Sequence, residues 1–255
     1  MSNIVEAKNM NKKVALGNEN ELHILKDINL DIEEGEFVSV MGPSGSGKST
    51  LLYNVSGMDR ISSGSVKFKG SEIGSMKEEE LAQLRLKNMG FIFQDINLLK
   101  NLSLIDNVMF PALVAKDADK NVVYEKARKL MEMTGIEKLA NHTTTQGSGG
   151  QLQRVGICRA LINDPDILFG DEPTGALDSK STEEIMAILS EINKNGTTVM
   201  LVTHDVKVAA KTERILFMVD GTIGAQKKMN KFDPQYEDMR QREESLMKWL
   251  VENGF

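Results

Sequence analysis

The order of apolar and polar positions predicts a β-rich first third of the chain. Residues 22–25 and 28–32 alternate between apolar and polar side chains, as half-buried strands do. Residues 36–41 form a strand that runs into a glycine-rich loop, and residues 49–58 are expected to form a helix. Residues 65–70 alternate again. One helix therefore interrupts a series of short strands.

The middle of the chain has helical spacing instead, with glycine stop signals between its segments. Three helices are expected there, at residues 104–113, 121–134 and 149–162. Strand, helix and strand then follow at residues 166–169, 182–193 and 197–202. The last of these is rich in β-branched residues, as a buried parallel strand is. We therefore expect an α/β fold with a mainly parallel sheet, an N-terminal antiparallel β subdomain and a helical insert at about residues 95–162.

The C-terminal residues 232–255 are expected to form a helical extension that begins after Pro234, beyond a domain of residues 1–231. One face of this helix is apolar, although Arg242 and Glu243 interrupt it. Its members are Met239, Leu246, Trp249 and Leu250. The stripe predicts packing against the domain, with docking onto a partner as the alternative.

Composition changes this picture little. The chain has 255 residues, 40% of them hydrophobic and 27% charged, which is ordinary for a soluble protein with one large domain. A net charge of -6 argues against a nucleic-acid-binding surface over the whole chain. Cys158 is the single cysteine, which excludes an intramolecular disulfide, and its helical, apolar neighbours predict a buried free thiol.

No segment of the sequence predicts membrane insertion. Residues 1–13 are polar and lack the apolar core of a signal peptide. No run approaches the roughly 18 apolar residues that a spanning helix needs. We therefore expect a cytoplasmic protein whose membrane role, if it has one, requires a partner.

The strongest chemical signal is the loop between the strand at 36–41 and the helix that follows it. It fits the phosphate-binding pattern G-x-x-x-x-G-K-[ST] through Gly42, Pro43, Ser44, Gly45, Ser46, Gly47, Lys48, Ser49 and Thr50. Its glycines let backbone N–H groups approach phosphate, and the helix adds the positive end of its dipole. Lys48 is expected to reach the β- and γ-phosphates, and the Ser49 hydroxyl is expected to bind Mg²⁺.

Paired carboxylates narrow the choice among phosphate-binding enzymes. The apolar run at 166–169 leads to Asp171 and Glu172. At the end of a strand beside the phosphate loop, Asp171 would lie near the metal, and Glu172 would polarise the attacking water as general base. Taken alone, the pair could also be an acidic turn after a strand.

A second glycine-rich segment opens the helix at 149–162. Small residues at a helix start expose free N–H groups, and a hydroxyl stands beside them. The residues are Gly147, Ser148, Gly149, Gly150 and Gln151. This second anion site, far along the chain from the first, is expected to serve another part of the same kind of nucleotide.

The sequence from Ser148 to Arg154 resembles the signature motif of ABC ATPases, usually written LSGGQ-x-Q-R. In that family the motif of one subunit closes over the ATP that the phosphate loop of the other subunit holds. The resemblance therefore implies a homodimer, with ATP and Mg²⁺ as cofactors. The short interval between Lys48 and the motif is similar to compact transporter ATPases, and no long coiled-coil insertion is visible. The nucleotide contacts implied in trans come from Ser148, Gly149, Gly150 and Gln151.

Three further motifs of the family follow in order. Gln94 matches the Q-loop, where the resemblance implies contact with the metal and the attacking water. Asp178 matches the D-loop and is expected to contact the opposite subunit, and His204 matches the H-loop and is expected to contact the γ-phosphate. The implied catalytic residues are thus Glu172, His204, Gln94 and Lys48. The implied metal ligands are Ser49, Gln94 and Asp171.

Residues 94–103 and 170–178 resemble a subgroup, the ATPases of lipoprotein-releasing and macrolide or antimicrobial-peptide exporters (LolD/MacB-like). The subgroup implies a separate integral membrane permease that ATP-driven dimerisation and hydrolysis power, a place on the inner face of the membrane, and no nucleic acid. One alternative is a soluble ABC ATPase that acts on ribosomes or nucleic acid, but the single cassette and missing basic patch disfavour it. The other is a regulator that does not hydrolyse ATP, which Glu172 and His204 disfavour.

Two positions depart from the family pattern. Gly147 stands where the signature usually begins with Leu, so the start of that helix is expected to pack less firmly. Leu16-Gly17 stands where the family usually has an aromatic residue, and residues 1–36 contain no Phe, Tyr or Trp. Since aromatic stacking on a base contributes about 1–3 kcal/mol, we expect weaker nucleotide affinity or looser base selectivity, with catalysis retained.

Overall fold

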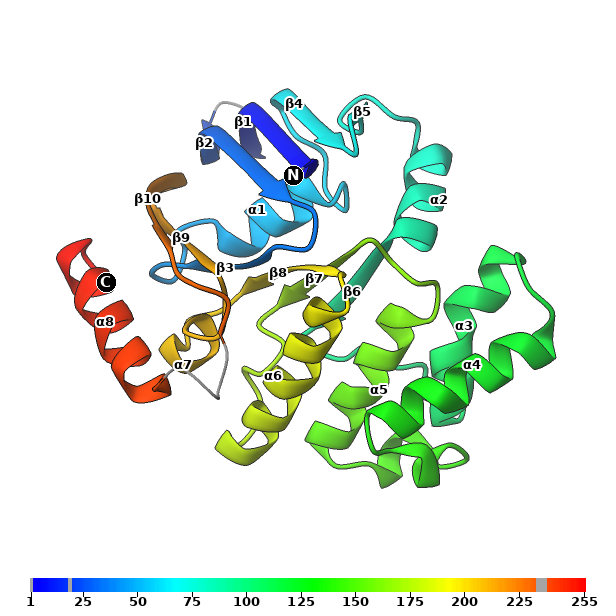
Figure 1. Ribbon diagram of the computed structural model, residues 1–255. Coiled ribbons are helices and arrows are strands. Elements are labelled where there is room, and N and C mark those ends of the chain that lie inside the picture. The colour runs from blue at the N-terminus through cyan, green and yellow to red at the C-terminus, as the bar shows by residue number, and fades with distance from the viewer. Residues whose placement is uncertain (1, 18–19, 233–237) are drawn as a thin grey trace. The chain divides into compact units, whose positions relative to one another are not determined.

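The computed structural model describes residues 2–17, 20–232 and 238–255. Its contacts divide the chain into two units (Figure 1). The first comprises Met1–Leu81 and Thr198–Phe255, and the second comprises Ala82–Thr197. The polypeptide therefore leaves the first unit, builds the second, and returns.

The first unit contains a four-stranded antiparallel sheet with the order β2-β1-β4-β5. Its strands are β1 (Asn3–Leu16), β2 (Asn20–Glu33), β4 (Ser63–Phe68) and β5 (Ser71–Glu72). The expected antiparallel β subdomain at the N-terminus is thereby confirmed.

The long hairpin β1–β2 differs from the sequence prediction, which had two short strands at 22–25 and 28–32 and none before them. The pairing contains several register shifts, and Asn9 and Asp27 have positive φ angles of 45° and 48°. Each shift moves the following side chains to the other face of the sheet, so the alternation breaks although the strand continues. One bulged strand therefore resembled two regular ones.

The first unit also contains parallel strands that lead to the phosphate loop. In the order β10-β9-β3-β8, strand β3 pairs in parallel with both β8 and β9, and β10 pairs antiparallel with β9. Every residue of β3 and β8 is buried, which explains their continuous apolar sequence. The bounds are β3 (Phe37–Met41), β8 (Thr198–Val202), β9 (Arg214–Val219) and β10 (Thr222–Lys228). Helices α1 (Lys48–Val55) and α7 (Val206–Ala209) follow β3 and β8.

The second unit combines one parallel strand pair with helices. Helix α2 (Glu78–Asn88) leads into β6 (Met89–Phe93), which pairs in parallel with β7 (Ile167–Asp171). The remaining helices are α3 (Leu104–Ala115), α4 (Lys120–Met133), α5 (Gly149–Leu161) and α6 (Ser179–Lys194). Short 3₁₀ turns, η1 (Glu137–Leu139) and η2 (Thr144–Gln146), precede α5. The predicted helical insert is present, and side chains cap its helices: Ser103 accepts from the Asp106 N–H, and Asp119 accepts from the Asn121 N–H.

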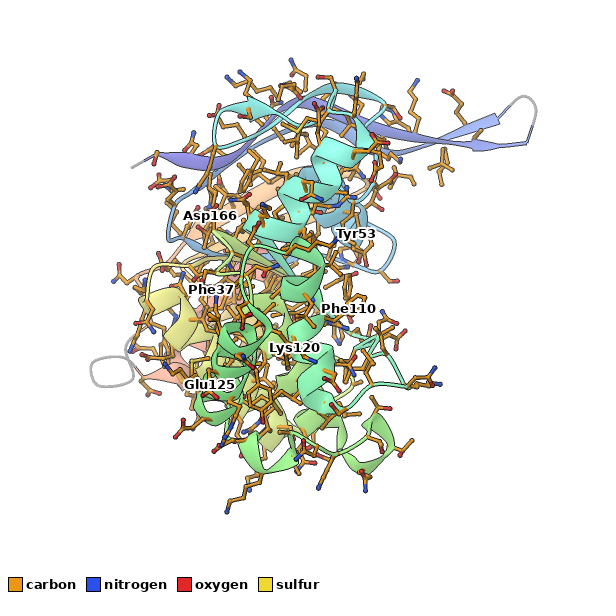
Figure 2. All side chains as sticks on the ribbon, turned by 90° about the vertical axis from the view of Figure 1, so that its right-hand side faces the viewer. Phe37, Tyr53, Phe110, Lys120, Glu125 and Asp166 are labelled. Carbon is orange, nitrogen blue, oxygen red and sulfur yellow. The ribbon has the colours of Figure 1, made fainter. Side chains whose placement is uncertain are left out.

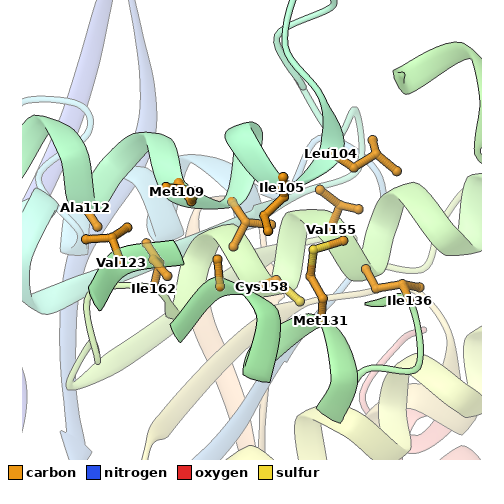
Figure 3. Packing of buried hydrophobic residues seen from close by; sticks show 12 residues of the cluster. Leu104, Ile105, Met109, Ala112, Val123, Met131, Ile136, Val155, Cys158 and Ile162 are labelled. Carbon is orange, nitrogen blue, oxygen red and sulfur yellow. The ribbon is translucent and has the colours of Figure 1, made fainter. Parts of the chain in front are cut away.

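Helices α3, α4 and α5 share one apolar core (Figure 3). The buried side chains that Figure 3 labels include Leu104, Met109, Val123, Met131 and Val155. Cys158 lies in the same core with its sulfur 3.1 Å from the Thr134 hydroxyl oxygen, and burial raises the pKa of its thiol to about 12. The thiol is therefore protonated and inert at neutral pH, and the expectation of a buried free cysteine is confirmed.

Helix α8 (Met239–Glu252) packs on the first unit through Leu246 and Leu250, which are fully buried beside Phe217. The Phe217 and Trp249 rings meet edge to face at 6.2 Å. Pro234, after which the helix was expected to begin, lies outside the described residues, and Asp238 caps the observed start. The apolar face therefore serves packing within this chain.

Arg242 was expected to interrupt that face, but the structure buries it. Its guanidinium donates to three carbonyls, those of Ala210, Thr212 and Asn230, at 2.5–2.8 Å. The Phe232 ring lies 5.7 Å from the guanidinium carbon. The side chain thus ties α8 to the loop after α7 and to the segment that precedes α8 itself.

Among the described helices, none is long and apolar enough to cross a membrane.

Replacing Arg242 by Ala is expected to lower the free energy of unfolding by about 2–4 kcal/mol, because it removes charge-assisted hydrogen bonds and leaves buried carbonyls without donors. Urea denaturation followed by circular dichroism measures the change. Arg240→Ala is the matched control, since the Arg240 side chain is 85% exposed and pairs with Glu244 one turn away. Equal losses in the two variants would contradict the anchoring role of Arg242.

Candidate active site

The phosphate loop joins buried β3 to α1, and its shape depends on glycine. A Cβ atom on Gly42, whose φ is 149°, would lie 2.2 Å from the Met218 carbonyl oxygen. Gly45 and Gly47 have φ angles of 81° and 99°, and nothing lies within 4 Å of a Cβ built on Gly45. These values describe a loop pressed against β9 on one side and open on the other. Phosphate can therefore approach its backbone closely.

The polar groups of the loop also fit a phosphate chain. Helix α1 begins at Lys48 without a side-chain cap, because its N-cap residue is Gly47. The Lys48 ammonium donates to the carbonyls of Gly42 and Pro43 at 3.0 and 2.9 Å, so it is held over the loop. The Ser46 hydroxyl oxygen is buried with no hydrogen-bond partner in the described structure. An uncapped helix start, a cation and an unpaired hydroxyl together suit an oxyanion.

The turn between β9 and β10 supports this loop, a role that the sequence analysis missed. The Gly221 N–H donates to the Ser46 carbonyl at 3.1 Å, and a Cβ on Gly221 would lie 2.2 Å from the Ile24 carbonyl oxygen. The available signal was Asp220-Gly221 between two apolar segments, which is a strong hairpin pattern. That pattern predicts the turn between β9 and β10, but it does not predict the contact of this turn with the phosphate loop.

His204 lies at the same end of the parallel strands as the phosphate loop. It follows β8, whose neighbour β3 leads into Gly42, with Val40 and Val202 in register. Buried Thr203 fixes the chain there: its N–H donates to the Val40 carbonyl at 3.1 Å, and its hydroxyl accepts from the Asp205 N–H at 3.0 Å. The His204 side chain is exposed. Within the first unit, the structure thus brings His204 and the phosphate loop to one strand end.

The second unit brings Gln94, Asp171 and Glu172 together. Phe93 and Asp171 are in register at the ends of β6 and β7, so Gln94 and Glu172 come next on neighbouring strands. A Cβ on Gly175 would lie 3.2 Å from both Gln94 Nε2 and Glu172 Oε2. Glu172 has a φ of 44°, an uncommon conformation for a residue with a side chain and one that is enriched at active sites. The Gln94 amide and the Glu172 carboxylate therefore lie beside the same glycine.

The signature segment begins α5 through a capping box. The Ser148 side chain accepts from the Gln151 N–H, and the Gln151 side chain accepts from the Ser148 N–H at 2.8 Å. A Cβ on Gly150 would lie 2.9 Å from the Ser181 hydroxyl oxygen of α6, so glycine permits this close approach. The Ser148 and Gly149 positions are exposed and available to a second molecule.

Asp178 of the D-loop has a structural role within this chain. It caps α6 by accepting from the N–H and the hydroxyl of Ser181, at 3.0 and 2.7 Å. These hydrogen bonds hold the pKa of the Asp178 carboxyl below its usual value. The carboxylate is exposed and ionised.

Two positions depart from the family pattern, Gly147 and Leu16. A Cβ on Gly147 would lie 2.6 Å from a methyl carbon of Leu152, so the Leu152 side chain covers the place that a residue larger than glycine would take. Looser packing at that helix start stays a prediction. The backbone of Leu16 pairs with Asn20, but its side chain lies outside the described residues. The adenine-end expectation therefore also stays a prediction.

Comparison with known proteins agrees with this geometry. The sequence profile of the ABC transporter family matches residues 25–175. The chain belongs to the ABC transporter family. A bacitracin export ATP-binding protein of Halalkalibacterium halodurans is 43% identical over 224 residues, 88% of each chain. A macrolide export ATP-binding/permease protein of Bdellovibrio bacteriovorus is 39% identical over 249 residues, 97% of this chain and 38% of that protein.

Solved structures confirm the predicted fold class. An ATP-binding cassette of Methanocaldococcus jannaschii, a dimer in a post-hydrolysis state bound to ADP and phosphate, has a TM-score of 0.83 and 40% identity. The match covers 89% of this chain and all of that one. By family and by fold this ABC chain is an ATPase cassette, and relatives with export names confirm the predicted subgroup. The chain spans 33% and 38% of the first two ATP-binding/permease proteins that it matches.

Gly42→Ala tests the side of the loop that packs against β9, and Gly45→Ala tests its open side. In Gly42→Ala the new methyl group meets a backbone carbonyl, so we expect a loss of about 3 kcal/mol of stability and at least tenfold weaker ATP binding. In Gly45→Ala only the left-handed conformation is penalised, by about 1–2 kcal/mol of stability. Thermal unfolding and nucleotide titration measure both. A more stable Gly42→Ala than Gly45→Ala protein would contradict the close approach to Met218.

Proposed function

We propose that this chain is the ATP-hydrolysing subunit of an ABC exporter and that it works as a head-to-tail homodimer. The observation that carries the proposal is the phosphate loop itself, an open glycine cradle with the uncapped start of α1 and the Lys48 ammonium. A dimeric relative that holds ADP and phosphate supports both the ligand and the pairing.

The proposed roles follow the chemistry of the donors. Lys48 binds the phosphates together with the backbone N–H groups of the loop at residues 42–50, except at Pro43, which has no N–H. Mg²⁺ prefers oxygen ligands, and the Ser49 hydroxyl, the Gln94 amide oxygen and the Asp171 carboxylate would hold it. Across the dimer, the contacts to nucleotide and partner come from Ser148, Gly149, Gly150, Gln151 and Asp178.

The hydrolysis step needs a base and a group that stabilises the developing charge. Glu172 accepts a proton from the attacking water, and Gln94, whose amide nitrogen lies by the same glycine as the Glu172 carboxylate, orients that water. His204 donates to the γ-phosphate, and Lys48 offsets its negative charge. Bound Mg²⁺ supplies further charge neutralisation between the phosphates. ATP binding holds the two ATPase subunits together, and phosphate release lets them separate.

The transport role rests on the relatives. Proteins named for the export of macrolides, bacitracin and syringafactin support an exporter, and two of them carry ATP-binding and permease parts in one chain. For this chain we propose a separate permease and a place on the cytoplasmic face of the membrane. We also propose residues 1–231, with the helical subdomain at about 95–162, as the ATPase domain and 232–255 as an extension.

Glu172→Gln is expected to bind ATP but to reduce turnover by about 10²–10⁴-fold, because the amide cannot accept the proton from water. The same variant should accumulate as an ATP-bound dimer. Phosphate release and size-exclusion chromatography with and without Mg-ATP measure the two effects. Glu191→Gln, on the exposed side of α6, is the matched control. Wild-type turnover in Glu172→Gln would remove Glu172 as the base.

A surface of α3 and α4 offers the permease a docking place. Both helices carry exposed apolar side chains, among them Phe110 and Val114 of α3 and Val122 of α4 with exposures of 46%, 48% and 60%, and Figure 2 labels Phe110. Val122 also lines a hollow of about 440 Å³, together with Ala112, Ala115, Ala118, Val123 and Ile162. The ion pairs Lys87–Asp117 and Lys126–Asp164 lie at the same hollow. An amphipathic cytoplasmic helix of the permease, with apolar anchors between polar flanks, fits this chemistry.

Phe110→Glu combined with Val122→Glu is expected to weaken binding to the permease at least tenfold, since one buried anchor contributes about 2 kcal/mol or more. Co-purification with the candidate permease, sought among neighbouring genes, measures the effect, and the basal ATPase activity of the free chain should not change. Met247→Glu, at an apolar position of α8 with 43% exposure, is the control. Unchanged co-purification would exclude this surface.

A further inference from the structure

The segment that follows Gln94 is fastened to the signature helix by one arginine. Arg159, in the last turn of α5, donates through one terminal nitrogen to the Ile96 carbonyl at 2.7 Å and through the other to the Asn97 carbonyl at 2.8 Å. Asn97 has a φ of 52°, which turns successive carbonyls toward the guanidinium. Among the described residues Arg159 has no acidic partner, so these two carbonyls are its polar contacts.

The same helix contacts the chain on both sides of Gln94. A Cβ on Gly156 would lie 3.1 Å from a methyl carbon of Ile96, so the Ile96 side chain rests directly on the helix. On the other side, the Gln153 amide donates to the Phe93 carbonyl at 3.2 Å, and Gln153 is only 2% exposed. Helix α5 thus holds the residues before and after Gln94.

The far end of the segment is tied to α3. Buried Asn107 accepts from the Leu99 N–H at 2.7 Å and donates to the carbonyls of Leu99 and Ser103 at 3.1 and 2.9 Å. Residues 96–103 are therefore held by side chains at both ends, although no helix or strand contains them. Because Asn97 is exposed, water can replace the Arg159 contacts without unfolding of the unit.

We propose that Arg159 is a positioning residue that joins Gln94 to the signature helix, so that Gln94 and Ser148 move as one piece. This inference rests on the proposed dimeric ATPase. In that dimer Ser148 contacts the nucleotide of the partner, whereas Gln94 contacts the nucleotide of its own chain. A stiff connection between them couples the two nucleotides, and the coupling is reciprocal. Arg159 therefore contributes to cooperative hydrolysis as well as to its rate.

The first measurement follows the segment itself and needs no activity. Cys158 is buried and its thiol is protonated, so a cysteine introduced at exposed Asp95 takes a nitroxide label selectively. We expect Arg159→Ala to raise the mobility of that label severalfold, and Arg159→Lys to restore part of the order. Gly156→Ala should raise the mobility of the label less than Arg159→Ala does, because its methyl group displaces the Ile96 side chain slightly while Arg159 keeps its hydrogen bonds. A label at Glu191 of α6 should not respond.

The second measurement compares kinetics without the label. We expect Arg159→Ala to lower kcat by about 10–100-fold with little change in KM, and to bring the Hill coefficient for ATP toward 1, since displacement of a positioned group by about 1 Å costs that much. Arg159→Lys should recover part of both. Arg128→Ala is the matched control, because Arg128 belongs to the same unit and pairs with the Glu137 carboxylate.

The outcomes separate this inference from the function on which it rests. If wild type hydrolyses ATP cooperatively and Arg159→Ala and Gly156→Ala behave like Arg128→Ala, the connection is wrong and the ATPase stands. If wild type does not hydrolyse ATP, the proposed function fails, and label mobility still decides whether Arg159 orders the segment. Ordered labels in both variants would overturn the proposal in either case.

Discussion

The parallel pairing of β3 with its two neighbours is the constraint on which the phosphate site depends. Both faces of β3 and β8 are covered, and the two strands pair in parallel along four consecutive residue pairs. The register places Val40 beside Val202, so the phosphate loop after β3 and the loop after β8 begin at the same end of the strands. On the other side, β9 presses the Met218 carbonyl against Gly42. The cradle is thus shaped by its surroundings as much as by its own glycines.

The same principle orders the groups of the second unit. Phe93 and Asp171 end neighbouring parallel strands, which places Gln94 beside Glu172 although they are far apart in sequence. These residues could be predicted because each motif stands at a strand end, and the carboxyl ends of parallel strands meet at one edge. The regular helices α3 to α6 were also predictable, since their apolar spacing and their caps agree.

Other features were beyond prediction from one sequence. The bulges at Asn9 and Asp27 change the facing of β1 and β2, and nothing in a period-2 pattern marks an inserted residue. Arg242 reads as a break in an apolar stripe because its partners are carbonyls of distant loops, and carbonyls leave no mark in a sequence. Gly221 and Arg159 escape for the same reason. Side chains that act on the backbone of another segment become visible only in three dimensions.

Hydrogen bonds to backbone carbonyls also explain how this ABC chain can hold the segment around Gln94 in place. Two successive carbonyls offer an arginine two hydrogen bonds without a second side chain that must itself be held in place. Arg159 and Gln153 use such bonds to hold the residues on both sides of Gln94, whose own side chain is exposed. A side chain that is proposed to meet water and metal has to stay accessible, so it cannot also be held by packing. Its rigidity must therefore come from its neighbours, and in this chain the helix headed by Ser148 supplies it.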